Sequence, residues 1–214
     1  MLRRLLQGDP GKASRFRDFE GRLPPLGAWR YLPVSIASTL RFKLTGGRAA
    51  IPWLGYRATR RIARLVGPGT RVLEFGSGLS TVWLARRGAQ VLSIETDAAW
   101  AAQVRSLLAG VPGHGVRLLQ ADPPYSPVLV AEERFDFVLV DGAGRDSAMA
   151  TALAVVRPGG HVYLDNADVP WGSHQAAREM ALRSGHAEWF VDFTPFHVFV
   201  STGILIRVGQ PAGS

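Results

Sequence analysis

From Thr70 onward, short apolar runs alternate with amphipathic stretches, and this alternation restricts the fold more than any other feature of the sequence. Short apolar runs are typical of buried strands, whereas longer stretches with helical periodicity are typical of helices. Strands that alternate with helices predict a parallel sheet covered by helices on both faces. A chain of 214 residues is long enough to bury such a sheet in a single hydrophobic core.

The alternation predicts seven strands, which we place at 71–76, 90–95, 116–121, 135–141, 160–166, 188–193 and 199–208. Helices are predicted between them at 80–88, 98–110, 145–157 and 173–185, and a packing helix at 56–67 precedes the first strand. Five strands interleaved with these helices and followed by a terminal pair of strands predict an α/β, Rossmann-like sheet.

The positive charge is concentrated in the N-terminal third of the chain. The net formal charge is +8, but residues 1–64 hold 14 Lys and Arg against 3 Asp and Glu, while residues 65–214 hold 11 against 14. Such a segment suits contact with nucleic acid, an anionic membrane surface or an acidic substrate, and a solvated Arg-rich surface is the simpler interpretation. We therefore divide the chain into a basic N-terminal arm at 1–50 and a folded domain at 51–214.

Composition excludes several other classes of protein. The chain has no cysteine, which rules out disulfides and thiolate metal sites. Its basic start lacks a sustained apolar stretch, so we expect no secretory signal. No apolar run has the length of a membrane span. We expect a cytoplasmic protein without a transmembrane segment.

The segment VLEFGSGLSTVWLA at 72–85 carries the strongest functional signal, because it places Glu74 and two glycines at the turn after the first predicted strand. Gly76 and Gly78 let the backbone pass close beneath a ligand, and the start of the following helix offers free N–H groups. The third glycine of a dinucleotide motif is missing. An acid two residues before the first glycine suits a cofactor that carries a cationic amino acid portion and no phosphate.

The ends of the next two predicted strands extend this pattern. Glu95, at the tip of the second strand, can accept hydrogen bonds from both hydroxyls of a ribose. Ala121 and Asp122 end the third strand, where an acid can accept a hydrogen bond from an adenine amino group. Together with Glu74, these strand ends describe a site for S-adenosylmethionine.

These motifs resemble those of the class I S-adenosylmethionine-dependent methyltransferases over about residues 50–208. The chain is also similar to a poorly characterised bacterial group with a Pro-Trp stretch, an E-F-G-S-G-x-S-T loop and an S-I-E-x-D-x-x-W segment, here Pro52 and Trp53, Glu74 to Thr81, and Ser93 to Trp100. The resemblance implies a seven-stranded class I sheet whose last strand is antiparallel. The residues expected to bind the cofactor are Trp53, Glu74, Gly76, Ser77, Gly78, Ser80, Thr81, Glu95, Thr96, Ala121, Asp122, Asp141 and Gly142.

The tetrapeptide from Asp122 to Tyr125 reads DPPY, which in methyltransferases of base amino groups grips a flipped-out base. In those enzymes the tetrapeptide follows the fourth strand, whereas here it follows the third. We therefore interpret it as a turn on the cofactor side, in which the prolines direct the chain away from the sheet. The base-clamp interpretation is the alternative.

Asp141 ends the fourth predicted strand, and Asp165 and Asn166 end the fifth. This arrangement resembles the divalent-metal site of catechol-type and caffeoyl-coenzyme-A-type O-methyltransferases, which implies Mg²⁺ bound by these three residues. That family commonly has a lysine soon after the first acid, whereas this chain has Arg145, and arginine is a poor general base. Without a metal, Asp141 would form a wall of the cofactor pocket.

Two residues are candidates for catalysis, Asp141 and His174. His174 follows the fifth strand at the mouth of the expected site, where a histidine can accept a proton, although a surface residue at a helix start is the alternative. Trp53 and Trp171 are candidates for lining the substrate pocket.

We expect O-methylation of a small molecule or saccharide. A methyltransferase of RNA or DNA that uses the basic N-terminal region for phosphate contacts is the first alternative. A non-catalytic cofactor-binding partner protein is the second, and a homodimer is compatible with each.

Overall fold

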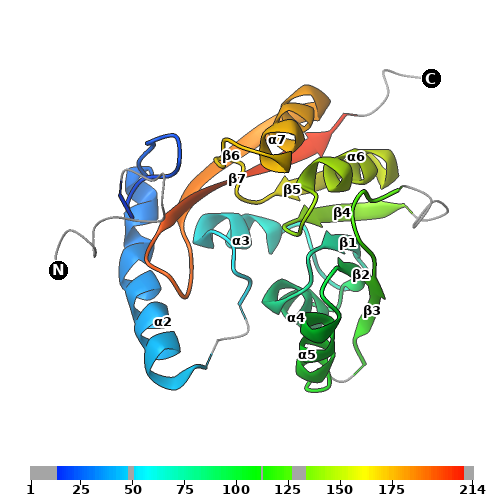
Figure 1. Ribbon diagram of the computed structural model, residues 1–214, viewed down its shortest axis with the longest axis horizontal. Coiled ribbons are helices and arrows are strands. Elements are labelled where there is room, and N and C mark those ends of the chain that lie inside the picture. Colours follow the sequence, from blue (N-terminus) through cyan, green and yellow to red (C-terminus); the bar gives the residue numbers. More distant parts are fainter. Residues whose placement is uncertain (1–13, 48–50, 112, 127–133, 210–214) are drawn as a thin grey trace.

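The computed structural model describes residues 14–47, 51–111, 113–126 and 134–209. Within these residues, seven strands form one sheet in the order β3-β2-β1-β4-β5-β7-β6 (Figure 1). The strands are β1 (Arg71–Phe75), β2 (Gln90–Glu95), β3 (Gly115–Gln120), β4 (Phe135–Val140), β5 (Val156–Leu164), β6 (Gly185–Phe193) and β7 (Val200–Val208). The first five strands pair in parallel, and β7 is antiparallel to both of its neighbours. This arrangement confirms the predicted fold class, including the antiparallel last strand.

Helices cover both faces of the sheet (Figure 1). On one face lie α3 (Tyr56–Ile62), α4 (Leu79–Arg86) and α5 (Ala98–Leu108), and on the other lie α6 (Arg145–Val155) and α7 (Ser173–Ser184). Each face has its own apolar core, built by α3 and α4 in one cluster and by α6 and α7 in another. Burial of these apolar stripes is what holds the layers together.

The strand register brings distant acids to one edge of the sheet. Phe75 of β1 is paired with Ile94 of β2 and with Val140 of β4, and Val140 is paired with Leu164 of β5. The residues that follow these positions, which include Glu95, therefore emerge side by side at the carboxyl ends of the parallel strands. Ligands of open α/β sheets bind at this edge.

The helix ends differ from the prediction by a few residues for local reasons. Helix α6 ends at Val155, and β5 begins at once at Val156, four residues before its predicted start. Pro158 is one reason why the helix does not reach its predicted end at residue 157, because a proline keeps the residue before it out of the helical region.

The N-terminal segment packs on the ends of β6 and β7. It contains a short 3₁₀ helix, η1 (Leu26–Tyr31), and a longer helix, α2 (Leu32–Thr45). Asp18 is fully buried and accepts a hydrogen bond of 2.7 Å from the hydroxyl of Thr202. The backbone N–H of Val200 donates to the carbonyl oxygen of Arg15 over 2.9 Å. Residues 1–13 and 48–50 of the predicted basic arm lie outside the described residues.

No helix within the described ranges is both long enough and apolar enough to cross a membrane.

Candidate active site

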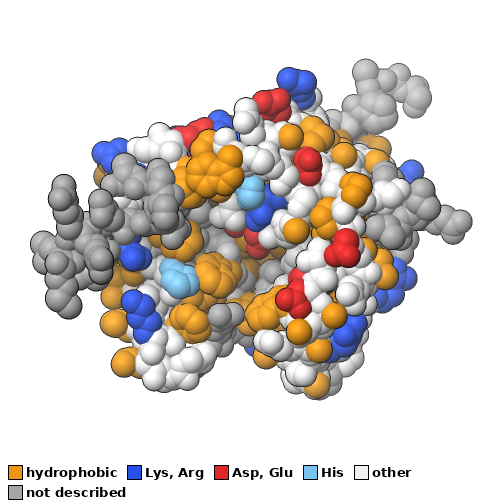
Figure 2. Space-filling model, in the orientation of Figure 1, with side chains coloured by type: hydrophobic (Ala, Val, Ile, Leu, Met, Phe, Trp, Pro, Cys, Tyr) orange, Lys and Arg blue, Asp and Glu red, His pale blue; other side chains and the backbone are white. Residues whose placement is uncertain are grey.

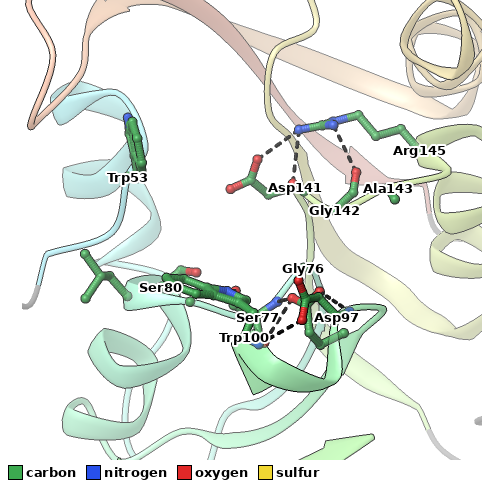
Figure 3. A pocket seen from close by; sticks show the side chains of 13 residues that line it. Trp53, Gly76, Ser77, Ser80, Asp97, Trp100, Asp141, Gly142, Ala143 and Arg145 are labelled. Carbon is green, nitrogen blue, oxygen red and sulfur yellow. Dashed lines mark hydrogen bonds and ion pairs between the residues drawn. The ribbon is translucent and has the colours of Figure 1, made fainter. Parts of the chain in front are cut away.

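A cavity of about 520 Å³ opens at the carboxyl edge of β1, β2 and β4. Figure 3 shows Trp53, Trp100 and Asp141 on three sides of this hollow. The residues that line it are Trp53, Gly76, Ser77, Gly78, Leu79, Ser80, Glu95, Asp97, Trp100, Asp141, Gly142, Ala143 and Arg145. We call it the first cavity.

The floor of the first cavity depends on two glycines that touch. Gly76 has a φ of 93°, which is a left-handed conformation that favours glycine. A Cβ atom on Gly76 would lie 2.6 Å from Cα of Gly142, and a Cβ atom on Gly142 would lie 2.8 Å from the backbone nitrogen of Gly76. The turns after β1 and β4 therefore approach each other as closely as backbone allows, which leaves room for a ligand above them.

Glu74 lies beneath this floor and is fully buried. Its Oε2 accepts hydrogen bonds from the hydroxyls of Thr81 (2.6 Å) and Ser93 (2.7 Å), and Thr81 in turn accepts one from the backbone N–H of Gly78 (2.8 Å). Burial raises the pKa of Glu74 to about 7, although nearby hydroxyls, including that of Ser80, favour the charged form. Among the described residues, none hydrogen-bonds its buried Oε1.

Glu95 fixes the loop on the β2 side of the first cavity. Its Oε2 accepts from the backbone N–H (3.0 Å) and the hydroxyl (3.1 Å) of Ser77. Its Oε1 accepts from the backbone N–H groups of Thr96 (2.9 Å) and Asp97 (3.0 Å). The carboxylate predicted to bind a ribose therefore also holds together the two turns that form the cavity wall.

Trp100 and Asp97 line the first cavity but were absent from the predicted site. Trp100 Nε1 donates to the carbonyl oxygen of Ser77 over 2.7 Å, which fixes the indole at the cavity wall. Asp97 caps α5, because its Oδ1 accepts from the backbone N–H groups of Ala99 and Trp100. Both residues belong to the S-I-E-x-D-x-x-W segment, so that segment already contained the signal for them.

Several predicted cofactor residues do not line the first cavity. Glu74 and Thr81 lie behind it, and Thr96 supports Glu95 from the turn. Ala121 and Asp122 follow β3 outside the lining. The residues that the cavity does bring together from the prediction are Trp53, Gly76, Ser77, Gly78, Ser80, Glu95, Asp141 and Gly142.

The tyrosine of the DPPY tetrapeptide packs in the core, and none of the four residues lines the first cavity. Tyr125 is buried, and its ring lies 4.9 Å from that of Phe75 at an angle of 46°. Its carbonyl oxygen accepts a hydrogen bond of 2.9 Å from the hydroxyl of Thr151. A tyrosine packed in this way is not available to stack on a base, which favours the turn over the base clamp.

Arg145 occupies the place where a metal ion was predicted. Its Nη2 donates to Oδ1 of Asp141 over 2.9 Å and to Oδ1 of Asn166 over 3.0 Å. Its Nη1 donates to the carbonyl oxygen of Gly142 over 2.9 Å, and the side chain is almost entirely buried.

These residues do not fit Mg²⁺. Two of the three predicted ligands already bind a guanidinium group, whose positive charge would repel a metal ion between them. In the part of the chain that the structure describes, no group of three acidic or histidine side chains is arranged to hold a metal. The predicted Mg²⁺ site at Asp141, Asp165 and Asn166 is therefore not supported.

A second cavity, of about 260 Å³, adjoins the first and shares Trp53 and Asp141 with it. Its remaining lining residues are Asp165, Asn166, Thr194, Phe199 and Ser201. The hydroxyl of Tyr163 donates to Oδ1 of Asp165 over 3.2 Å. We call this the second cavity.

Two carboxyl groups share the wall of the second cavity, and they influence each other. Burial raises the pKa of Asp165 well above its usual value, and the neighbouring charge of Asp141 raises it further. Burial also raises the pKa of Asp141, against the charge and hydrogen bond of Arg145, which lower it. Two neighbouring buried acids do not both ionise readily, because each negative charge disfavours the other. The pair therefore holds one proton over a range of pH in which a single surface acid is fully ionised.

His174 lies at the start of α7, and neither cavity includes it among its described lining residues. Burial and the charge of Arg145 lower the pKa of His174 to about 4. Trp171 is half exposed and packs edge to face against Phe19, with ring centres 5.0 Å apart. Trp53 does line both cavities, and it stacks on His197 at 4.9 Å.

Residues 73–164 match a family model described as a methyltransferase domain. The fold is similar to that of an O-methyltransferase from Streptomyces achromogenes involved in tomaymycin synthesis, solved in complex with SAM, with 20% identity and a TM-score of 0.60 over 87% of this chain and 100% of that chain. It is also similar to cofactor-bound Rv0187 from MTB, with 21% identity and a TM-score of 0.60 over 87% of this chain and 93% of that chain. A SAM-dependent O-methyltransferase from Thermotoga maritima has 16% identity and a TM-score of 0.57 over 83% of this chain and 73% of that chain. The chain has no match among curated proteins.

The fold is therefore that of the class I methyltransferases. The domain match and the fold together support an enzyme, an S-adenosylmethionine-dependent methyltransferase, as the sequence predicted.

Proposed function

We propose that this protein transfers a methyl group from S-adenosylmethionine to a hydroxyl oxygen of a small molecule or saccharide in the cytoplasm. The observation that carries the proposal is the pair of adjoining cavities that share Trp53 and Asp141. The first has room for the cofactor, and the second brings an acceptor to the carboxyl pair at its wall. The resemblance to the poorly characterised bacterial group supports the cofactor and does not indicate the acceptor.

The first cavity suits the cofactor in both shape and charge. The amino acid portion would lie over Gly76 and Gly78, and the buried carboxyl group of Glu74 behind them would favour its cationic group. The ribose would lie toward Glu95, with Asp97 as a second carboxylate on the same side. The adenine would then lie between Trp100 and the end of β3, where Ala121 and Asp122 complete the predicted set.

The second cavity suits a small polar acceptor. Its lining combines two aromatic rings, Trp53 and Phe199, with the hydroxyls of Thr194 and Ser201. Rings pack against the apolar face of a sugar or an aromatic acceptor, and hydroxyl groups hydrogen-bond its substituents. The volume of about 260 Å³ accommodates one ring of such an acceptor rather than a long polymer.

When bound, S-adenosylmethionine supplies the methyl group from its sulfonium centre. The chain aligns the acceptor oxygen with that group and removes the hydroxyl proton. We assign the removal of this proton to the carboxylate of Asp141, which Arg145 orients through a hydrogen bond of 2.9 Å. Asp165, whose pKa is raised well above its usual value, holds the one proton that the pair retains. His174 is less suited as the base, because its lowered pKa makes it a weak proton acceptor.

A transfer assay tests this proposal. The protein is incubated with tritiated S-adenosylmethionine and, separately, with phenols, monosaccharides, and mixed RNA. We expect label in a small hydroxyl compound and loss of that transfer in the variant Asp141→Asn, which keeps the shape of the side chain. Label in RNA alone would contradict the proposal and favour a nucleic-acid methyltransferase. Cofactor binding without transfer to any acceptor would favour a non-catalytic partner protein.

A further inference from the structure

Helix α2 is oriented with its polar side inward. Its two buried residues are Ser35 and Thr39. Ser35 donates a hydrogen bond of 2.7 Å to the carbonyl oxygen of Thr194, and Thr39 donates one of 2.7 Å to the carbonyl oxygen of Ser35. A helix on the surface of a globular protein normally buries its apolar side and exposes its polar side. This helix does the opposite.

The outward side of α2 carries an apolar stripe. Ile36, Leu40 and Leu44 follow one another at intervals of four, which places them on the same side of the helix. Leu40 is 53% exposed and Leu44 is 82% exposed. Leu26 of η1, just before the helix, is 93% exposed. Figure 2 shows hydrophobic side chains next to Lys and Arg side chains on the part of the surface over the lower end of α2.

Positive charge borders this stripe. Arg41 and Lys43 are exposed and, by the turn of an α-helix, lie on opposite sides of the line from Ile36 to Leu44. At the N-terminal end of α2 lies a hollow whose charged lining residues are Arg30, Arg57, Arg60, Arg61, Arg64 and Glu188. Glu188 pairs with Arg61 over 3.0 Å, and the other four arginines leave the hollow with an excess of positive charge. The sequence has no Asp or Glu between Glu20 and Glu74. The surface therefore combines exposed apolar groups with positive charge from side chains that have no acids beside them in sequence.

We infer that this outward side of α2, with its apolar stripe and bordering cations, is a docking surface for a bilayer that contains anionic lipids. Apolar side chains enter the boundary between headgroups and acyl chains, and the Lys and Arg beside them meet anionic headgroups. The helix is far too short to span a bilayer, so it lies in the plane of the interface.

Charge favours a lipid surface over a second copy of the chain. A symmetric dimer through α2 brings Arg41 and Lys43 of one copy near the same residues of the other. The absence of acids from 21–73 leaves nothing in that segment to neutralise them. An anionic bilayer satisfies both the apolar stripe and the charge.

This surface is also connected to the candidate active site. Phe42, on the inward side of α2, packs edge to face against the ring of His197 at 6.1 Å. His197 stacks on Trp53, which lines both cavities. An acceptor in the membrane or at its surface would therefore approach the protein on the side of α2, where the rings of Phe42, His197 and Trp53 connect the helix to the two cavities.

A vesicle flotation assay tests the inference without cofactor or acceptor, so its result is independent of methyl transfer. The full chain is mixed with vesicles of phosphatidylcholine alone or of phosphatidylcholine with phosphatidylglycerol. We expect binding to the anionic vesicles, and on the order of 10-fold weaker binding to neutral ones. High salt should weaken the binding to anionic vesicles.

Two variants separate the apolar and the charged contributions. The combined change Ile36→Ser, Leu40→Ser and Leu44→Ser should reduce vesicle binding by on the order of 10-fold or more, because it removes the inserted groups. The combined change Arg41→Gln and Lys43→Gln should reduce it by on the order of 10-fold. The matched control is Leu182→Ser, which removes an exposed leucine from α7 and should leave binding unchanged.

The inference is overturned if the chain binds neutral and anionic vesicles equally, or if the apolar variant binds as well as the wild type. It is also overturned if sedimentation without vesicles shows a dimer that the apolar variant dissociates, because α2 would then be an interface between copies. Thermal unfolding checks that each variant is folded, and the charge variant tests the inference by itself if the apolar variant is not.

Discussion

Arg145 Nη2 lies 2.9 Å from Oδ1 of Asp141 and so places a permanent positive charge beside the acid that both cavities share. The same nitrogen also donates to Oδ1 of Asn166, which follows the neighbouring strand β5, over 3.0 Å. A side chain of the protein thus provides, at this edge of the sheet, the cation that the sequence led us to expect from a metal ion.

The first prediction concerns the variant Arg145→Ala. The guanidinium lowers the pKa of Asp141, so its loss should raise that pKa and leave less carboxylate at neutral pH. We expect kcat/KM to fall on the order of 100-fold at pH 7, and its rise with pH to move to higher pH. Arg145→Lys should recover part of the activity at neutral pH, because the lysine ammonium group keeps the positive charge but cannot make all the hydrogen bonds of the planar guanidinium group. A pH profile that is the same in all three proteins would exclude this role.

The second prediction is that transfer does not depend on a divalent metal. Because Arg145 occupies the predicted ligands, removal of metal ions by a chelator should leave the transfer rate unchanged, and added Mg²⁺ should not increase it. Initial rates with and without the chelator provide the measurement. Loss of activity that Mg²⁺ restores would show that the guanidinium moves aside for a metal.

The third prediction concerns Gly76→Ala. A Cβ atom there would lie 2.6 Å from Cα of Gly142, and the φ of 93° is unfavourable for alanine. We expect a loss of about 1–3 kcal/mol in the free energy of unfolding, together with a large loss of cofactor affinity. Urea unfolding and calorimetric titration measure the two effects.

The control for this variant is Gly69→Ala. Gly69 also has a positive φ, 78°, but a Cβ atom there would meet nothing within 4 Å. The variant Gly69→Ala therefore has the energetic cost of an alanine at positive φ but no steric clash of the added Cβ atom, so cofactor affinity should be retained. Equal loss of affinity in both variants would contradict the role assigned to the contact between Gly76 and Gly142.

The fourth prediction is a pH dependence of stability that arises from Glu74. Burial raises its pKa from 4.5 to about 7 in the folded protein. The unfolded chain therefore releases this proton at lower pH than the folded chain, and the free energy of unfolding falls as pH rises from 4.5 to about 7. The shift corresponds to about 3 kcal/mol.

The variant Glu74→Gln isolates this contribution, because glutamine cannot ionise. Urea unfolding of both proteins at pH 5 and pH 8 should show a smaller decline in the variant than in the wild type. An equal decline in the two proteins would place the pH dependence elsewhere.

The fold and the strand-end acids could be predicted because each depends on local sequence. Apolar runs fixed the strands, and the chain order of Glu74, Glu95 and Asp141 followed from the alternation of strands and helices. Parallel strands end at one edge, so acids at successive strand ends must meet there. That reasoning holds without any side-chain detail.

Arg145 and α2 could not be predicted in the same way. The guanidinium reaches Asn166 across a separation of 21 residues in the chain, and nothing in the sequence near Arg145 indicates that partner. In α2 the hydroxyl side is buried and the apolar side is exposed, so hydrophobic periodicity indicates the wrong side. Trp100 could have been predicted as a site residue, since it ends the S-I-E-x-D-x-x-W segment. Its hydrogen bond to Ser77 could not, because that contact depends on how two turns fold together.

The most direct test of this account is calorimetric titration of the protein with S-adenosylhomocysteine, which measures cofactor binding without a need for the acceptor. We predict binding of about one molecule per chain at the first cavity. The variant Glu95→Ala should weaken it by on the order of 10-fold or more, since Glu95 lines the cavity and holds its two turns together. Glu179→Ala, at an exposed acid on α7, should bind as the wild type does. An absence of binding, or binding that Glu95→Ala leaves unchanged, would contradict the assignment of this cavity to the cofactor.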